Sequence, residues 1–224
     1  MGRVAVGSSF IGLGAVALAA ILAGCQHHAG TSTPKTASID DTTTPEYVSS
    51  LPPEQSRPAV NKLANEVVAA ENAACKAQPE VDWIACMSSR MVIDFDRYGF
   101  LANHCRDKPD YKSLRDCALF GRSGVDWLLA MNGSPDTDFD WSQPRQSHDA
   151  ALKKLNDVLT EACEGKPEQS GNSCFTSESA RRLGLSETVA TNCAARATLE
   201  ERGACIVDAH DAAMYQAALN SQTG

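Results

Sequence analysis

Residues 75–86 read CKAQPEVDWIAC, and residues 163–174 read CEGKPEQSGNSC. Each stretch begins and ends with cysteine and carries Pro-Glu at the same internal position. The match extends further, because the four cysteines of the first half each have a counterpart 88 positions later: Cys75, Cys86, Cys105 and Cys117 correspond to Cys163, Cys174, Cys193 and Cys205. Four equal offsets indicate an internal duplication with the pattern C-x10-C-x18-C-x11-C in each copy.

The first copy, residues 58–133, has the periodicity of three helices. The first is expected from Pro58 to Cys75, because Pro58 suits a first turn and Pro79 follows the cysteine. The second is expected to run without a break from Asp82 to Cys105. The third starts at Asp110, carries an apolar stripe and stops at Gly133.

The second copy, residues 147–220, is expected to repeat this plan. Ser147 is the expected N-cap of its first helix. The middle helix, about 173–192, is the least marked, because it contains Gly184 and few large apolar residues. Residues 198–201 read TLEE, the pattern of a capping box that opens the last helix. With only 6% aromatic residues, the chain is expected to be all-α: a tandem duplication of a three-helix, two-disulfide repeat.

Helix geometry also predicts how the cysteines pair. Cys86 and Cys105 would lie about 28 Å apart at opposite ends of one continuous helix, whereas a disulfide needs Cα atoms within about 7 Å. In an up-down-up bundle the expected pairs are therefore Cys75–Cys86, Cys105–Cys117, Cys163–Cys174 and Cys193–Cys205. A zinc site is disfavoured, since zinc-binding cysteines usually stand two to four residues apart.

The N-terminus has the features of an export signal. Arg3 precedes an apolar run over residues 4–23, and Leu22-Ala23-Gly24 leads into Cys25. This segment resembles the signal peptide and lipobox of bacterial lipoproteins. The resemblance implies that residues 1–24 are removed and that Cys25 carries covalent lipid. An uncleaved transmembrane anchor is the alternative, because the run is about long enough to span a bilayer.

The resemblance also bears on location. Several acyl chains anchor a protein stably to a membrane, which places this one in the cell envelope. Gln26, rather than Asp, follows the cysteine, which favours the outer membrane facing the periplasm if the organism is Gram-negative. Export also favours oxidised cysteines.

Residues 25–57 are expected to form a lipidated, disordered linker, because Thr, Ser and Pro dominate there without helical or strand periodicity. His27 and His28 are expected to be solvated in it. The formal net charge of −8 argues against nucleic acid as a partner. The expected partners are the membrane, through the lipid on Cys25, and an envelope protein.

A second linker is expected at residues 134–146. Asp136, Asp138 and Asp140 resemble the start of a calcium loop. However, Trp141 stands where that loop needs glycine and Ser147 where it needs glutamate, so an acidic solvated linker is favoured over this weak calcium candidate. The two aromatic residues of the linker, Phe139 and Trp141, are expected to tuck between the repeats or, alternatively, to contact a partner.

No residue pattern indicates catalysis. His104, His210, Asp94 and Asp96 invite such an interpretation, but helix-surface or capping roles are favoured, and no cofactor is expected beyond the lipid. The predicted function is structural or protein-binding, as an accessory subunit of an envelope assembly and not an enzyme. The alternative is a periplasmic hydrolase inhibitor or small-ligand-binding module.

Overall fold

Polar caps set the starts of five helices. The computed structural model describes residues 44–78 and 82–222, with the backbone alone for residues 168–170, and every regular element in these ranges is a helix. Five residues at helix starts each accept a hydrogen bond from the backbone amide three positions later: Thr44, Asp82, Asp110, Ser186 and Thr198. The capping box predicted at Thr198 and Glu201 is present.

The all-α fold class is confirmed. The helices are α1 (Pro45–Ser50), α2 (Pro53–Lys76), α3 (Trp83–Phe95), α4 (Phe100–His104), α5 (Tyr111–Ala130), α6 (Pro135–Asp138), α7 (Pro144–Ala162), α8 (Glu168–Leu183), α9 (Glu187–Ala194) and α10 (Leu199–Ser221). No helix of the described ranges combines the length and the apolarity that a membrane span requires.

The duplicated unit contains five helices rather than three. At the offset of 88, the start of α5 corresponds to the start of α10, and the ends of α1 and α3 correspond to the ends of α6 and α8. The short helices α1 and α6 are thus counterparts. We call α1–α5 repeat 1 and α6–α10 repeat 2.

Both expected linkers therefore differ from the structure where it describes them. Residues 45–50 and 53–57 are helical, and Val48 of α1 is fully buried with Val60, Leu63 and Ala212. Residues 135–138 and 144–146 are also helical, so α7 starts before Ser147, with Gln143 as N-cap and Pro144 in the first turn. Pro58 likewise lies inside α2 rather than at its start. Residues 25–43 of the expected linker lie outside the described residues.

The middle helix of each repeat is broken at the same place. The continuous helix predicted over 82–105 is instead α3 and α4, separated by Gly99 at φ +85°. Asp96 accepts a hydrogen bond from the backbone amide of Ala102 at 2.7 Å and stabilises this turn. The helix predicted over 173–192 is likewise split, because Gly184 ends α8 at φ +68° and Ser186 caps α9.

The four disulfides of the structure are the pairs that the sequence predicts. They are Cys75–Cys86, Cys105–Cys117, Cys163–Cys174 and Cys193–Cys205, with Cα–Cα distances of 5.7, 5.6, 5.9 and 5.5 Å. Each bond joins two neighbouring helices of one repeat. Cys86 and Cys105 do not bond to each other, although the helix predicted between them is broken.

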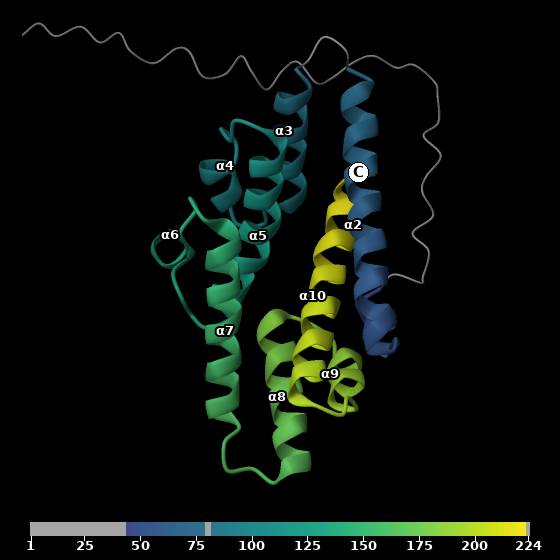
Figure 1. Ribbon diagram of the computed structural model, residues 1–224, viewed down its shortest axis with the longest axis vertical. Coiled ribbons are helices and arrows are strands. Elements are labelled where there is room, and N and C mark those ends of the chain that lie inside the picture. Colours follow the sequence, from purple (N-terminus) through teal and green to yellow (C-terminus); the bar gives the residue numbers. More distant parts are fainter. Residues whose placement is uncertain (1–43, 79–81, 223–224) are drawn as a thin grey trace, which may run out of the picture. The chain divides into compact units, whose positions relative to one another are not determined.

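The two repeats exchange their long helices instead of forming two separate bundles. The long helix α2 of repeat 1 packs along α10 of repeat 2, and its counterpart α7 packs along α5 of repeat 1 (Figure 1). The short helices follow the same rule, since α1 lies on α9 and α10 whereas α6 lies on α5. Reciprocal contacts of this kind are the signature of a twofold relation, so a pseudo-twofold axis relates the repeats.

Candidate binding groove between the repeats

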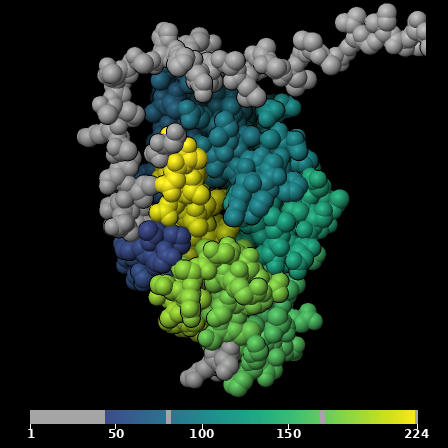
Figure 2. Space-filling view, turned by 180° about the vertical axis from the view of Figure 1, so that it is seen from behind, coloured from purple at the N-terminus to yellow at the C-terminus, as the bar shows by residue number. Residues whose placement is uncertain are grey.

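A groove of about 550 Å³ opens between the two repeats. It is lined by the ends of α3 and α8, the turns that follow them, and one face each of α5 and α10. These elements meet on the face in Figure 2, where the yellow residues of α10 border the teal residues of repeat 1 and the light-green residues of α8 and α9.

The lining follows the duplication closely. Sixteen of the nineteen lining residues form eight pairs at the offset of 88: Ile93/Arg181, Asp94/Arg182, Phe95/Leu183, Asp96/Gly184, Arg97/Leu185, Arg122/His210, Asp126/Met214 and Leu129/Ala217. The groove therefore lies on the pseudo-twofold axis. The paired residues nevertheless differ in every case, so the groove is symmetric in backbone and asymmetric in chemistry.

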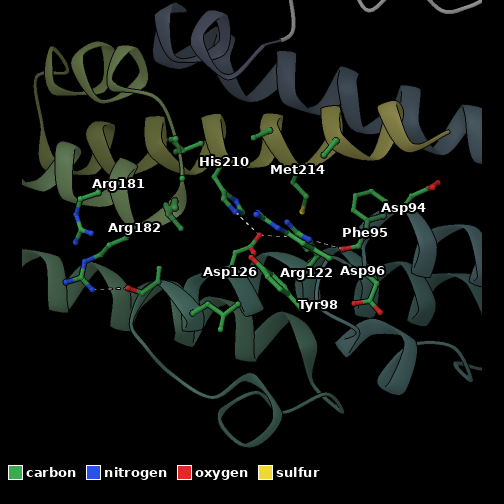
Figure 3. A pocket seen from close by; sticks show the side chains of 18 of the residues that line it. Asp94, Phe95, Asp96, Tyr98, Arg122, Asp126, Arg181, Arg182, His210 and Met214 are labelled. Carbon is green, nitrogen blue, oxygen red and sulfur yellow. Dashed lines mark hydrogen bonds and ion pairs between the residues drawn. The ribbon is translucent and has the colours of Figure 1, made fainter. Parts of the chain in front are cut away.

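Three charged side chains meet at the centre of the groove. Arg122 donates to Asp126 at 3.0 Å and to the backbone carbonyl of Phe95 at 3.2 Å, and Nε2 of His210 lies 3.1 Å from the same Asp126 carboxylate. Figure 3 shows Asp126 between the other two side chains. The ring of Trp127 packs on the imidazole with 4.2 Å between centroids. This contact ties α5 of repeat 1 to α10 of repeat 2.

The surroundings of His210 favour its charged form. Burial alone would lower the pKa of His210, but hydrogen bonding and charge attraction from Asp126 and Asp211 outweigh burial and raise it. Burial would raise the pKa of Asp126, yet the contacts with His210 and Arg122 lower it. These contacts therefore favour the imidazolium form of His210 and the carboxylate form of Asp126.

The charges continue from the groove through α10 to α2. Nδ1 of His210 lies 3.6 Å from Asp211, Asp211 pairs with Arg57 at 2.7 Å, and Arg57 also contacts Asp208. With Arg122 and Asp126, these six residues hold three carboxylates, two guanidinium groups and one imidazole. The set is neutral when His210 is protonated and all three carboxyl groups are ionised. Both ring nitrogens face carboxylates, so His210 is not placed to act as a base on a bound molecule.

The two ends of the groove carry opposite charges (Figure 3). Arg181 and Arg182 lie at the α8 end, where both bond to Glu178, and Arg182 also donates to the backbone carbonyl of Ala130 at 2.9 Å. Asp94 and Asp96 lie at the α3 end. The four labelled charges thus define a polar axis along the groove.

A buried carboxyl group interacts with the acidic end. Glu71 of α2 is fully buried, and neither of its oxygens makes a hydrogen bond in the described part of the chain. Burial, and then the nearby charge of Asp94, raise the pKa of Glu71 to about 8. Glu71 is therefore mostly protonated at neutral pH.

The aromatic residues predicted as possible partner contacts are buried. Phe139 is 3% exposed and Trp141 9%. A Cβ at Gly124 would lie 2.3 Å from the Phe139 ring, and one at Gly121 would lie 2.7 Å from the Trp141 ring, so these glycines of α5 leave room for the two rings. The two rings are thus buried against α5, which agrees with the tucked position and leaves little of their surface for a partner.

The three aspartates of the weak calcium candidate make separate contacts. Asp136 lies 3.6 Å from His104, Asp138 accepts from the backbone of Ser134, and Asp140 accepts from Ser142. Within the described ranges, no group of three or more His, Cys, Asp or Glu side chains could hold a metal ion. Cys25, the predicted lipidation site, and the pair His27 and His28 lie outside the described residues.

Sequence reasoning missed the groove and misplaced His210, which is 5% exposed rather than on a helix surface. One signal could have found the centre. Arg122 and His210 occupy equivalent positions in the duplicated pattern, and a pseudo-twofold axis brings equivalent positions of paired helices together.

Comparisons with known proteins found no match for the chain. No protein-family model, no curated protein and no solved structure matches it.

Proposed function

We propose that this chain is a lipid-anchored envelope protein that binds a partner protein through the groove between its repeats. The anchor rests on the lipobox-like residues 22–25. Partner binding rests on the groove, and the role is that of an accessory subunit rather than an enzyme.

The observation that carries the proposal is the distribution of exposed apolar side chains. Six large apolar residues are well exposed in the described ranges, and three of them, Ile93, Tyr98 and Leu129, line this one groove at 67%, 42% and 37% exposure. Scattered single apolar residues need no explanation, but a cluster beside a concave surface marks an interaction site. A rim of charged residues around such a cluster is typical of transient protein interfaces.

Site-specific cross-linking tests the proposal. A photo-crosslinking amino acid at position 93 should capture a defined protein in the native membrane, whereas the same group at Leu199, which is 48% exposed outside the groove, should not. Ile93→Asp should abolish the co-purifying complex, and Leu199→Asp should leave it intact. Equal loss from both variants, or identical products at both positions, would refute groove binding.

The membrane anchor has a separate test. Intact mass spectrometry of the detergent-purified chain should give residues 25–224 with acyl chains and four disulfides. Cys25→Ser should move the protein from the membrane fraction to the soluble fraction, and an unmodified Cys25 in the mature protein would rule out the anchor.

A small charged molecule is the second candidate occupant. The groove volume of about 550 Å³ lies within the range of small-molecule sites. Such a ligand would appear as a fixed mass increment in native mass spectrometry and would not require a co-purifying protein.

A further inference from the structure

The charge difference between the two ends of the groove comes from residues at equivalent positions. Asp94 of repeat 1 stands where repeat 2 has Arg182, and Ile93 stands where repeat 2 has Arg181. A strictly symmetric groove would bind an occupant equally well in two directions. The opposite charges remove that equivalence, so the groove can distinguish one direction of an occupant from the other.

The α8 end has a cation available for an incoming anion. Two guanidinium groups, those of Arg181 and Arg182, share the single carboxylate of Glu178. The side chain of Arg181 is 68% exposed, whereas that of Arg182 is 21% exposed and fixed by its bond to a backbone carbonyl. A carboxylate that approaches this end meets an excess positive charge and free N–H donors, which arginine offers to planar anions.

The α3 end has the opposite balance. Asp94 accepts hydrogen bonds from Ser221 and Gln222 at 2.8 and 2.9 Å, which are neutral donors. Within the described residues, no lysine or arginine forms an ion pair with Asp94 or Asp96. Arg97 also lines this end, with its guanidinium over the ring of Tyr98, 5.4 Å from the centroid, so the α3 end has two carboxylates and one guanidinium.

The middle of the groove offers no net charge but has apolar surface. The network of Arg122, Asp126 and His210 is neutral together with its buried continuation. Tyr98 and Leu129, which are 42% and 37% exposed, supply this apolar surface, whereas Phe95 and Met214 of the lining are almost fully buried. An occupant that matches this pattern has an anionic end, an apolar centre and a cationic end.

We propose that the occupant is an extended amphoteric segment of the partner protein, bound in one direction. Its carboxylate side chains face Arg181 and Arg182, its lysine or arginine side chains face Asp94 and Asp96, and apolar side chains lie between. The inference rests on the proposed function and specifies the chemistry of the partner.

Two peptides of identical composition and a third with glutamate in place of lysine provide the test. The first probe is a fluorescein-labelled twelve-residue peptide with Glu at one end, Leu and Ala in the centre and Lys at the other end. The second has the same residues with Glu and Lys alternating, and the third carries Glu at both ends. Fluorescence anisotropy with the full detergent-purified chain should show that the first binds at least about fivefold more tightly than the other two.

Two variants locate the binding. Arg181→Glu and Asp96→Asn should each weaken the first peptide several-fold, while Arg106→Glu, an exposed arginine outside the groove, should change its affinity little. Equal binding of the three peptides, no binding of any, or equal effects of Arg181→Glu and Arg106→Glu would overturn the inference. Cross-linking at position 93 could still succeed in each of those cases, so failure of this inference is distinguishable from failure of the proposed function.

Discussion

Replacing Glu71 with glutamine should raise the free energy of unfolding at neutral pH. The glutamate lies in α2 at the position that corresponds to Leu159 of α7, and both side chains are at most 1% exposed. Equivalent core positions of the two repeats thus hold a carboxyl group in repeat 1 and an apolar side chain in repeat 2. Because burial, and then Asp94, raise its pKa to about 8, folding at pH 7 requires Glu71 to take up a proton that it lacks in the unfolded chain.

The cost follows from proton linkage. The native state binds more protons than the unfolded state between the ordinary value of 4.5 and about 8, so the free energy of unfolding falls as pH rises through that window. One pH unit corresponds to about 1.4 kcal/mol, so the cost at pH 7 is about 3 kcal/mol and at pH 5 about 1 kcal/mol. Glutamine keeps the shape of the protonated group without this cost. The stabilisation should therefore be larger at pH 7 than at pH 5.

Urea denaturation followed by circular dichroism, with disulfides intact, measures the effect. Glu66→Gln is the matched control, because Glu66 lies on the same helix with its side chain 47% exposed, beside Lys62 at 3.8 Å. That variant should change stability by less than about 0.5 kcal/mol at either pH. If Glu71→Gln destabilises the protein at both pH values, Glu71 is ionised and paired in the native state, and the reasoning from burial fails.

Three further predictions concern the packing of two glycines, one disulfide and the contacts of His210. Gly124→Ala should lower the free energy of unfolding by about 1–3 kcal/mol, because its Cβ would clash with the Phe139 ring. Gly203→Ala in α10 should raise it by up to about 1 kcal/mol, because nothing lies within 4 Å of the added Cβ. Thermal unfolding of both variants tests this. Replacing Cys75 and Cys86 together by serine should cost about 3 kcal/mol in the chain-entropy account, and a cost near zero in urea denaturation would contradict a constraining role. The pKa of His210 is raised from 6.5, so its stabilising contribution is present below pH 6.5 and is lost as pH rises through the pKa of the folded state. His210→Gln should therefore lower the free energy of unfolding more at pH 6 than at pH 9. A loss that does not depend on pH would refute the charged pair.

Much of the local structure could be predicted because local signals determine it. The cysteine offsets indicate the duplication, the prolines at positions 79 and 167 of the sequence predict a break between helices, and Thr198 with Glu201 marks a helix start. The short helix α1 could not be predicted, because Val48 is its only buried large apolar side chain and lies among Thr, Ser and Pro residues. Its order comes from packing on α9 and α10, which are far away in the sequence.

The exchange of helices between repeats could not be predicted for a related reason. The apolar stripe of α2 fits α5 of its own repeat or α10 of the other, and helical periodicity indicates which face is buried but not against which partner. The groove depends on this choice, since its lining comes from both repeats. The central residues of the groove could therefore be identified only once it was known which helices pack together.

The disulfides and the packing of the exchanged helices stabilise different parts of the molecule. All four disulfides of the described residues join helices within one repeat, and none crosses the groove. The groove is instead bridged by the contact of His210 with Asp126 and Trp127, and by the bond from Arg182 to the carbonyl of Ala130. These contacts are ionic, aromatic and polar, and they supplement the apolar packing of α2 on α10 and of α5 on α7, which also joins the repeats. The disulfides therefore join neighbouring helices within each repeat, and the packing of the exchanged helices joins the repeats to each other.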